Sequence, residues 1–192
     1  MSLMQGVEFS HWIIDNYLDE YNVLVDATCG NGYDTLFLSS KISQKGKIYA
    51  FDIQKDAIES TKSKFKEKKT NIEFINDGHE NLDKYINEDI NCIIYNLGYL
   101  PGSNKKVVTE KETTIKSLKI ALELLANNGL IVLVIYSEHE GGRKEKNAVL
   151  KFSSNLDYKK YNVLHYNFIN QKMNPPEVVV INKRGDHNEA SS

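Results

Sequence analysis

Two acidic residues and a glycine-rich turn are the strongest candidates in this sequence for binding a ligand. Asp26 ends a short apolar run, and Gly30 and Gly32 follow it within the segment DATCGNGYDT. Glycines at such a turn let the backbone approach a ligand closely. Asp52 ends the next apolar run, twenty residues after Gly32, where a carboxylate can bind the two hydroxyls of a ribose. This spacing predicts a cofactor that contains a nucleoside.

The same segment separates two classes of cofactor. Dinucleotide oxidoreductases place glycine or alanine at the third position of Gly-x-Gly-x-x-Gly, where this chain has Thr35. They also bind a pyrophosphate, which a carboxylate directly before the loop, Asp26, would repel. Asp26 instead suits S-adenosylmethionine, which has an ammonium group, a sulfonium and a ribose but no phosphate. The loop favours a methyltransferase, and an NAD-dependent oxidoreductase is the less favoured alternative.

A second group of polar residues, Asn-Asp-Gly-His, follows the third apolar run. If that run is a strand of a parallel sheet, its end lies at the edge where ligands bind. Asp77 can accept a hydrogen bond from an adenine amino group, and His79 can cover the ring. A polar turn with a helix N-cap explains the same residues equally well.

The segment after the fourth apolar run, YNLGYLPG, is the candidate for the reacting loop. The side-chain carbonyl of Asn96 can accept from an amine N–H and orient the nitrogen lone pair toward a methyl group, which is catalysis by positioning. Tyr99 can stack on a flat substrate. The segment is related to the Asn-Pro-Pro-Tyr motif of amino-group methyltransferases. Both prolines are replaced, and the motif alone therefore leaves the amine substrate open.

Two further segments place histidines near this chemistry. His139 and Glu140, in the run YSEHEGG after the fifth apolar stretch, can bind substrate or move a proton. A solvent-facing turn at the start of a helix is the competing interpretation. His11 lies in the first predicted helix and is assigned to packing rather than to chemistry.

The elements that must position these residues alternate along the chain. Most apolar runs are continuous, as in strands buried on both faces of a parallel sheet. Strands are predicted at residues 22–26, 47–52, 71–75, 89–95, 129–136, 160–168 and 177–181, and helices at 7–18, 33–41, 55–66, 109–126 and 147–154. The short turn before the last strand predicts that this strand is antiparallel. We therefore expect an α/β fold, a seven-stranded, mostly parallel sheet with helices on both faces.

Composition limits the remaining possibilities. The 192 residues suit one domain, which we place at residues 4–183, followed by a polar tail at 184–192 that we expect to be disordered. Cys29 and Cys92 form no Cys-x-x-Cys pair, which argues against a zinc knuckle and favours a cytosolic location. No metal site is predicted. The net charge of −2 restricts any nucleic-acid-binding face to a local patch.

Taken together, the motifs resemble those of the YtqB/MnmM family, long labelled putative rRNA methylases. The resemblance rests on DATCGNGYDTLFL, AFDIQKDAI, NLGYLPG, SEHEGG and FINQKMNPPE, which occur in this order between residues 7 and 183. It implies a Rossmann-like class I fold, S-adenosylmethionine as the cofactor, and a homodimer. It also implies a tRNA substrate, with N-methylation of 5-aminomethyl-2-thiouridine at the wobble position in the anticodon stem-loop.

The resemblance also implies roles for individual positions. The residues that match its cofactor-binding motifs are Asp26, Gly30, Asn31, Gly32, Asp34, Asp52, Gln54, Gly78 and His79. Asn96, Leu97 and Gly98 match its reacting loop. Many relatives have serine in place of Gly78; a backbone contact would survive that difference, whereas a hydroxyl contact would not. Three alternatives stay open: a methyltransferase of rRNA or of a small amine, an oxidoreductase, and a non-catalytic RNA-binding module.

Overall fold

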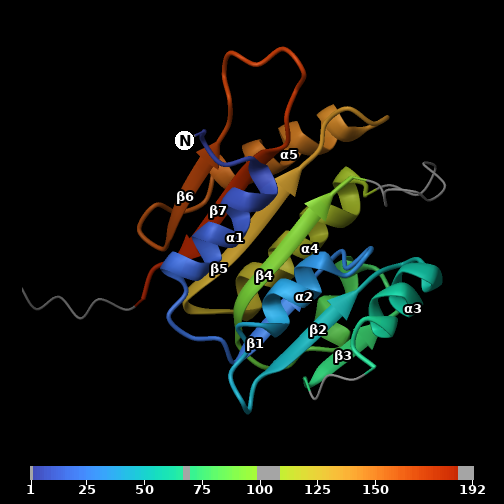
Figure 1. Cartoon of the computed structure of the whole chain (residues 1–192). Helices are drawn as coiled ribbons and strands as arrows, with labels where there is room; N and C mark the ends of the chain where they lie inside the picture. Colours follow the sequence, from blue (N-terminus) through green and yellow to red (C-terminus); the bar gives the residue numbers. More distant parts are fainter. Residues whose placement is uncertain (1, 67–69, 99–108, 186–192) are drawn as a thin grey trace, which may run out of the picture.

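A single seven-stranded sheet organises the protein. The computed structural model describes residues 2–66, 70–98 and 109–185. The strands are β1 (Val23–Asp26), β2 (Lys47–Phe51), β3 (Ile72–Ile75), β4 (Ile90–Leu97), β5 (Leu125–Ile135), β6 (Tyr161–Tyr166) and β7 (Glu177–Lys183). They lie in the order β3-β2-β1-β4-β5-β7-β6, and β7 is antiparallel to both of its neighbours (Figure 1). The predicted α/β fold, with its antiparallel last strand, is confirmed.

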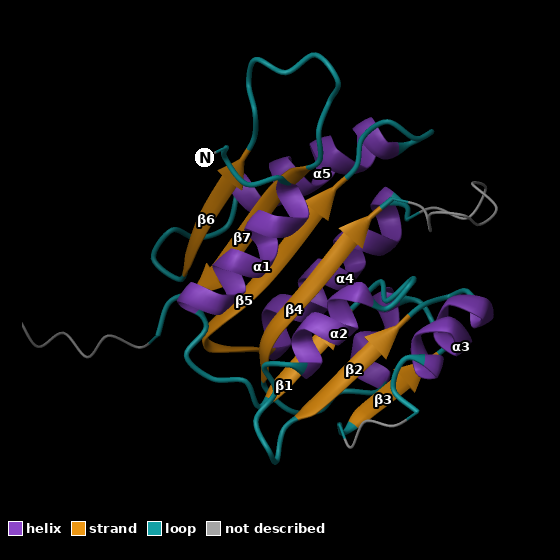
Figure 2. Cartoon of the chain, in the orientation of Figure 1, coloured by secondary structure: helices purple, strands orange, loops and turns teal. Residues whose placement is uncertain are grey.

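Helices cover both faces of the sheet (Figure 2). They are α1 (Gly6–Tyr17), α2 (Tyr33–Ser39), α3 (Lys55–Ser63), the 3-10 helix η1 (His79–Lys84), α4 (Lys111–Leu124) and α5 (Gly142–Ser154). The helices α1 and α2 pack with one face of the sheet, and η1, α4 and α5 pack with the other. Among the described residues, the structure contains no helix with the length and apolar character needed to cross a membrane.

The core explains why the central strands are continuous apolar runs. Successive residues of a strand point to opposite faces of a sheet. In β4, Ile93 belongs to the cluster under α4 and α5, whereas Ile94 belongs to the cluster under α1 and α2, and both are fully buried. Each such side chain contributes roughly 1.5–3 kcal/mol on burial. These two apolar layers hold the carboxyl ends of β1, β2 and β4 side by side.

Several predicted boundaries differ from the structure, and the largest differences are at the starts of β5 and α5. The helix predicted at 109–126 ends at Leu124, and β5 starts at Leu125, four residues before the predicted strand. Asn128 takes a positive φ of 62° inside β5, where the sequence suggested a stop between helix and strand. The helix predicted at 147–154 begins earlier, at Gly142, because glycines that suggest a turn here form the helix N-terminus. The 3-10 helix η1 was not predicted.

The predicted tail is only partly within the described residues. Lys183 ends β7, and Arg184 N–H donates to the Lys160 carbonyl at 2.8 Å. Gly185 N–H donates to Oδ1 of Asn128 at 3.0 Å. These contacts tie residues 184 and 185 to the sheet, so the expected tail starts too early. Residues 186–192 lie outside the described residues.

Candidate active site

The glycine-rich loop after β1 is built around the buried carboxyl of Asp26. This carboxyl accepts from the Thr35 hydroxyl at 2.6 Å and from the Thr28 N–H at 3.3 Å. Asp26 is 1% exposed and Thr35 is fully buried. Burial and then the nearby charge of Asp34 raise the pKa of Asp26 to about 8, against the opposing effect of its two hydrogen bonds. Asp26 therefore joins Thr28, at the start of the loop, to Thr35 in the first turn of α2.

Gly32 sets the direction in which the chain enters α2. Its φ is 77°, in the left-handed region that favours glycine. A Cβ at this position would lie 2.8 Å from Cγ2 of Thr61 on α3. The hydroxyl of Thr61 in turn donates to the Gly30 carbonyl at 3.0 Å. The loop therefore packs directly on α3, with no space for a side chain at Gly32.

Asp52, just beyond the end of β2, binds the loop from the other side. Its Oδ2 accepts from the Gly30 N–H and its Oδ1 from the Gln54 N–H, each at 2.9 Å. Burial raises the pKa of Asp52, and the two N–H donors oppose that shift. A carboxylate has about four acceptor positions. Two positions therefore stay available for the two hydroxyls of a ribose.

The segment after β3 is a turn whose polar groups are joined by hydrogen bonds. Asp77 accepts from its neighbour Gly78 N–H at 2.8 Å and from the Asn81 side chain at 2.9 Å. His79 is 7% exposed, and burial lowers its pKa to about 4. A neutral imidazole can pack against a flat base without adding charge. The atoms nearest to a Cβ at Gly78 would be those of the flexible carboxylate end of Glu80.

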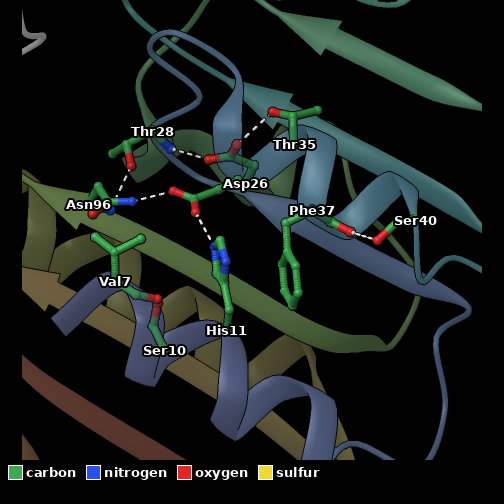
Figure 3. Close-up of polar contacts among 10 residues, drawn as sticks. Val7, Ser10, His11, Asp26, Thr28, Thr35, Phe37, Ser40 and Asn96 are labelled. Atoms are coloured by element: carbon green, nitrogen blue, oxygen red, sulfur yellow. Dashed lines mark hydrogen bonds and ion pairs between the residues drawn. The ribbon is translucent and has the colours of Figure 1, made fainter. Parts of the chain in front are cut away.

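Two residues hold the end of β4, Thr28 in the glycine-rich loop and Asp34 in α2. The backbone N–H of Asn96 donates to the Thr28 hydroxyl at 2.7 Å. The side-chain Nδ2 of Asn96 donates to Oδ2 of Asp34. Figure 3 shows Asn96 from β4 and His11 from α1 each joined by a dashed line to one unlabelled carboxylate, which is that of Asp34. Within residues 2–66, 70–98 and 109–185, the side-chain carbonyl of Asn96 has no donor and can accept from a ligand.

A cavity of about 620 Å³ connects these groups, a size typical of small-molecule sites. Five acidic residues line it: Asp34, Asp52, Asp77, Glu80 and Glu110. Among its described lining residues there is no lysine or arginine. Such a cavity attracts a cationic ligand and disfavours a pyrophosphate. The alternative of a dinucleotide oxidoreductase is therefore the poorer fit.

The lining fits S-adenosylmethionine. Asp52 offers acceptors for the ribose, Asp77 and His79 form the corner expected to hold an adenine, and Asp34 offers a negative charge to an ammonium group. Asn96 lies on the same wall. The residues present therefore match the ribose, the adenine and the ammonium group of this cofactor.

A neighbouring cavity of about 600 Å³ has a different character. Its lining comprises Ser137, Glu138, His139, Gly141, Arg143, Lys144 and Asn174. Tyr136 lines the first cavity and adjoins Ser137 in the chain, so the two cavities are neighbours. The second cavity carries two cationic side chains and one carboxylate. It can therefore accept an anionic group beside the acidic cavity.

The described site residues that were predicted fall into three groups: those that line the first cavity, those that do not line it, and His139, which lines the second cavity. The cofactor cavity contains Gly30, Asn31, Asp34, Asp52, Gln54, His79 and Asn96. Asp26, Gly32, Thr35, Gly78 and Leu97 support it without lining it, so a direct cofactor contact by any of them stays a prediction. His139 lines the second cavity, separate from Asn96. Tyr99 lies outside the described residues.

Sequence reasoning missed three residues at this site. Nε2 of His11 lies 2.6 Å from Oδ1 of Asp34, although the sequence suggested packing alone. The Thr28 hydroxyl fixes the end of β4, and Tyr136 forms part of the cavity wall. Thr28 and Tyr136 lie within the motifs DATCGNGYDT and YSEHEGG, but no role was predicted for either, and His11 lies in no motif. Only the docking of α1 onto α2 brings His11 to Asp34.

Sequence comparison identifies related proteins. A family described as "Putative rRNA methylase" matches residues 48–182. A relative from Arabidopsis thaliana, "tRNA (mnm(5)s(2)U34)-methyltransferase, chloroplastic", is 35% identical over 184 residues, which cover 89% of this chain and 67% of the relative.

Solved structures support the same relationship. A putative rRNA methylase from Clostridium thermocellum is 40% identical with a TM-score of 0.91, and the match covers 95% of this chain and 100% of that chain. A putative methyltransferase from Streptococcus mutans in complex with SAH is 39% identical with a TM-score of 0.86, over 95% and 99%. A Thermotoga maritima O-methyltransferase, at 10% identity and a TM-score of 0.66 over 98% and 69%, shares the fold.

The close packing at Gly32 predicts that an added methyl group destabilises the protein more there than at an uncrowded glycine. Gly32→Ala incurs about 1–2 kcal/mol of left-handed backbone strain and about 1–3 kcal/mol of overpacking against Thr61. Gly141→Ala is the control, because Gly141 has a φ of 85° but nothing within 4 Å of its added Cβ. Urea unfolding should show a larger loss for Gly32→Ala. Equal losses would contradict the packing argument.

The raised pKa of Asp26 predicts a pH-dependent stability. The folded state keeps the proton to a higher pH than the unfolded chain, so this group's contribution falls as pH rises from about 4 to about 8. Asp26→Asn removes that dependence, whereas Asp19→Asn, at an exposed loop position, retains it. The measurement is the free energy of unfolding in urea across this range. An unchanged slope in Asp26→Asn would refute the assignment.

Proposed function

This chain belongs to the family of putative rRNA methylases, and on that basis we propose that it is an S-adenosylmethionine-dependent N-methyltransferase of tRNA. The substrate would be 5-aminomethyl-2-thiouridine at the wobble position, and the product 5-methylaminomethyl-2-thiouridine. The observation that carries the proposal is the amide of Asn96 on the wall of an acidic cavity, with its Nδ2 engaged by Asp34. The Arabidopsis relative named for this nucleoside supports the choice of substrate.

The proposed chemistry needs little beyond positioning. S-adenosylmethionine supplies a methyl group already activated by its sulfonium. A lysine-like amine has a pKa near ~10.4, so it must lose a proton before it attacks. Burial in a closed site lowers the pKa of an amine. Oδ1 of Asn96 then accepts one N–H of the neutral amine and directs its lone pair toward the methyl carbon.

The second cavity supports an RNA substrate. Arg143 and Lys144 line it beside the acidic cofactor cavity, and both side chains are exposed. Phosphate groups bind lysine and arginine and contribute much of the affinity between proteins and nucleic acids. Because the protein carries a net charge of −2, such a local patch is the form of RNA contact that its composition permits. His139 in the same cavity is a candidate to bind substrate or accept a proton.

The proposal also includes a cytosolic homodimer. The support for the dimer is the edge strand β6, where Val163 and Leu164 are 41% and 46% exposed. Exposed apolar residues on an edge strand are a common site of pairing between chains. Light scattering during size-exclusion chromatography tests the assembly, and a monomeric mass at micromolar concentration would overturn it.

The activity is tested with labelled S-adenosylmethionine and bulk tRNA from a host that lacks this gene. Digestion and mass spectrometry should place the label on 5-methylaminomethyl-2-thiouridine. Label in rRNA or in a small amine instead would move the substrate to the second candidate. No label in any substrate, with cofactor binding confirmed, would favour the non-catalytic binding module.

The role proposed for Asn96 predicts a separation of turnover from binding. Asn96→Ala removes the amide that orients the amine, and kcat should fall by about 10²-fold or more. The Kd for S-adenosylhomocysteine, measured by calorimetry, should stay close to the wild-type value. Parallel loss of kcat and affinity would instead assign Asn96 to cofactor binding.

The basic cavity predicts a specific loss of RNA affinity. The double variant Arg143→Ala/Lys144→Ala should raise the KM for tRNA. It should also reduce the salt dependence of binding by about one unit of slope for each phosphate that the protein no longer neutralises. Lys151→Ala is the control, because Lys151 is exposed at the far end of the same helix. An unchanged KM and salt slope in the double variant would place the RNA elsewhere.

A further inference from the structure

A chain of three side chains runs from the first helix of the protein to the reacting loop. Nε2 of His11 lies 2.6 Å from one oxygen of Asp34, and the other oxygen accepts from the side chain of Asn96 (Figure 3). The Asp34 side chain is 10% exposed. Its carboxylate therefore has two side-chain partners, one on α1 and one on β4, and little contact with solvent.

The imidazole of His11 is itself held in one orientation. It stacks on Phe37 with ring centroids 3.8 Å apart and an angle of 2° between the planes. Phe37 lies three residues after Asp34, so both occupy the same face of α2. One face of α2 thus provides the ring that fixes the plane of His11 and the carboxylate that its Nε2 meets.

The orientation of the Asn96 amide follows from this arrangement. An ionised carboxylate only accepts hydrogen bonds, so the end of the amide that faces Asp34 is Nδ2. The carbonyl end then points away and can accept from an amine. An amide without this partner can turn by half a rotation and present N–H to the amine, which would draw the lone pair away from the methyl group.

We infer that His11 is a positioning residue for methyl transfer, acting through Asp34 to fix the amide of Asn96. This inference rests on the proposed function, because it concerns the amide that we propose orients the amine. His11 need not touch substrate or cofactor. It holds Asp34 at the distance and angle from which that carboxylate selects one of the two orientations of the Asn96 amide.

Two substitutions at His11 separate positioning from packing. His11→Leu keeps an apolar side chain beside Phe37 but removes the donor, and kcat should fall by about tenfold or more through misplacement of the amine. His11→Gln restores an N–H donor, and kcat should return toward the wild-type value. The Kd for S-adenosylhomocysteine and the unfolding midpoint should change little in either variant.

His165→Leu is the matched control. His165 on β6 is paired with Glu177 at 2.8 Å, and its side chain is 35% exposed compared with 26% for His11. It is thus a second pair of histidine and carboxylate, outside both cavities. Its removal should leave kcat unchanged. If the loss of any histidine–carboxylate pair lowered activity, His165→Leu and His11→Leu would reduce kcat by the same factor.

A double-mutant cycle tests the path through Asp34. If His11 acts through this carboxylate, His11→Leu should have no further effect on kcat once Asp34→Ala is present. Multiplicative effects of the two substitutions would overturn the inference. So would a wild-type kcat in His11→Leu, a failure of His11→Gln to restore activity, or a parallel loss of kcat and cofactor affinity.

A readout without substrate keeps this inference distinct from the proposed function. The side-chain NH₂ signals of Asn96, identified by their loss in Asn96→Ala, report directly on its amide. They should shift in His11→Leu and return in His11→Gln. If the wild-type protein fails to methylate tRNA but these signals respond, the proposed substrate fails and the positioning stands. Asn96 NH₂ signals that do not change in His11→Leu would overturn the positioning role of His11.

Discussion

The parallel pairing of β1 with its two neighbours is the constraint on which the site depends. Asp26, the last residue of β1, lies opposite Ala50 on β2 and Ile94 on β4. Neighbouring strands are about 4.8 Å apart, so the glycine-rich loop, Asp52 and Asn96 leave the sheet at adjacent positions. The two apolar layers on the faces of the sheet fix this register. A shift of one residue would turn each of these side chains to the opposite face.

The acidic residues at this edge have two uses. Burying a carboxylate is costly, and here hydrogen bonds from the backbone and hydroxyl groups offset part of that cost. Asp26 and Asp52 each accept two such bonds and thereby hold the loop in shape before any ligand is present. The negative charge that remains in the cavity suits a cationic cofactor, while the cationic side chains lie in the adjoining cavity. The separation of charge between the two cavities matches a cationic donor and an anionic acceptor.

The sequence predicted those parts of the site that depend on local order along the chain. Asp26, Asp52 and Asn96 each end or directly follow a continuous apolar run, so their convergence followed from the expected sheet. The pairing of His11 with Asp34 depends on how α1 docks, and no local signal specifies that geometry. The position of His139 in a separate cavity depends on where α5 begins. Gly141 and Gly142 obscured this helix start, because glycine has low helix propensity in general but suits an N-terminus here.

The order of the strands affects how the protein is completed during synthesis. β7 follows β6 in the chain, yet it lies between β5 and β6, so β6 is synthesised before the strand that joins it to the rest of the sheet. The helix α1 precedes β5 and β7 in the chain but packs on both, and Phe9 stacks on Tyr166 at 4.0 Å. The contacts of α1 with β7 and with Tyr166 can therefore form only after β6 and β7 have been synthesised. A nascent chain that has not yet reached β6 already contains the glycine-rich loop, Asp34 and Asn96, but its helix α1 lacks the β7 part of its packing surface.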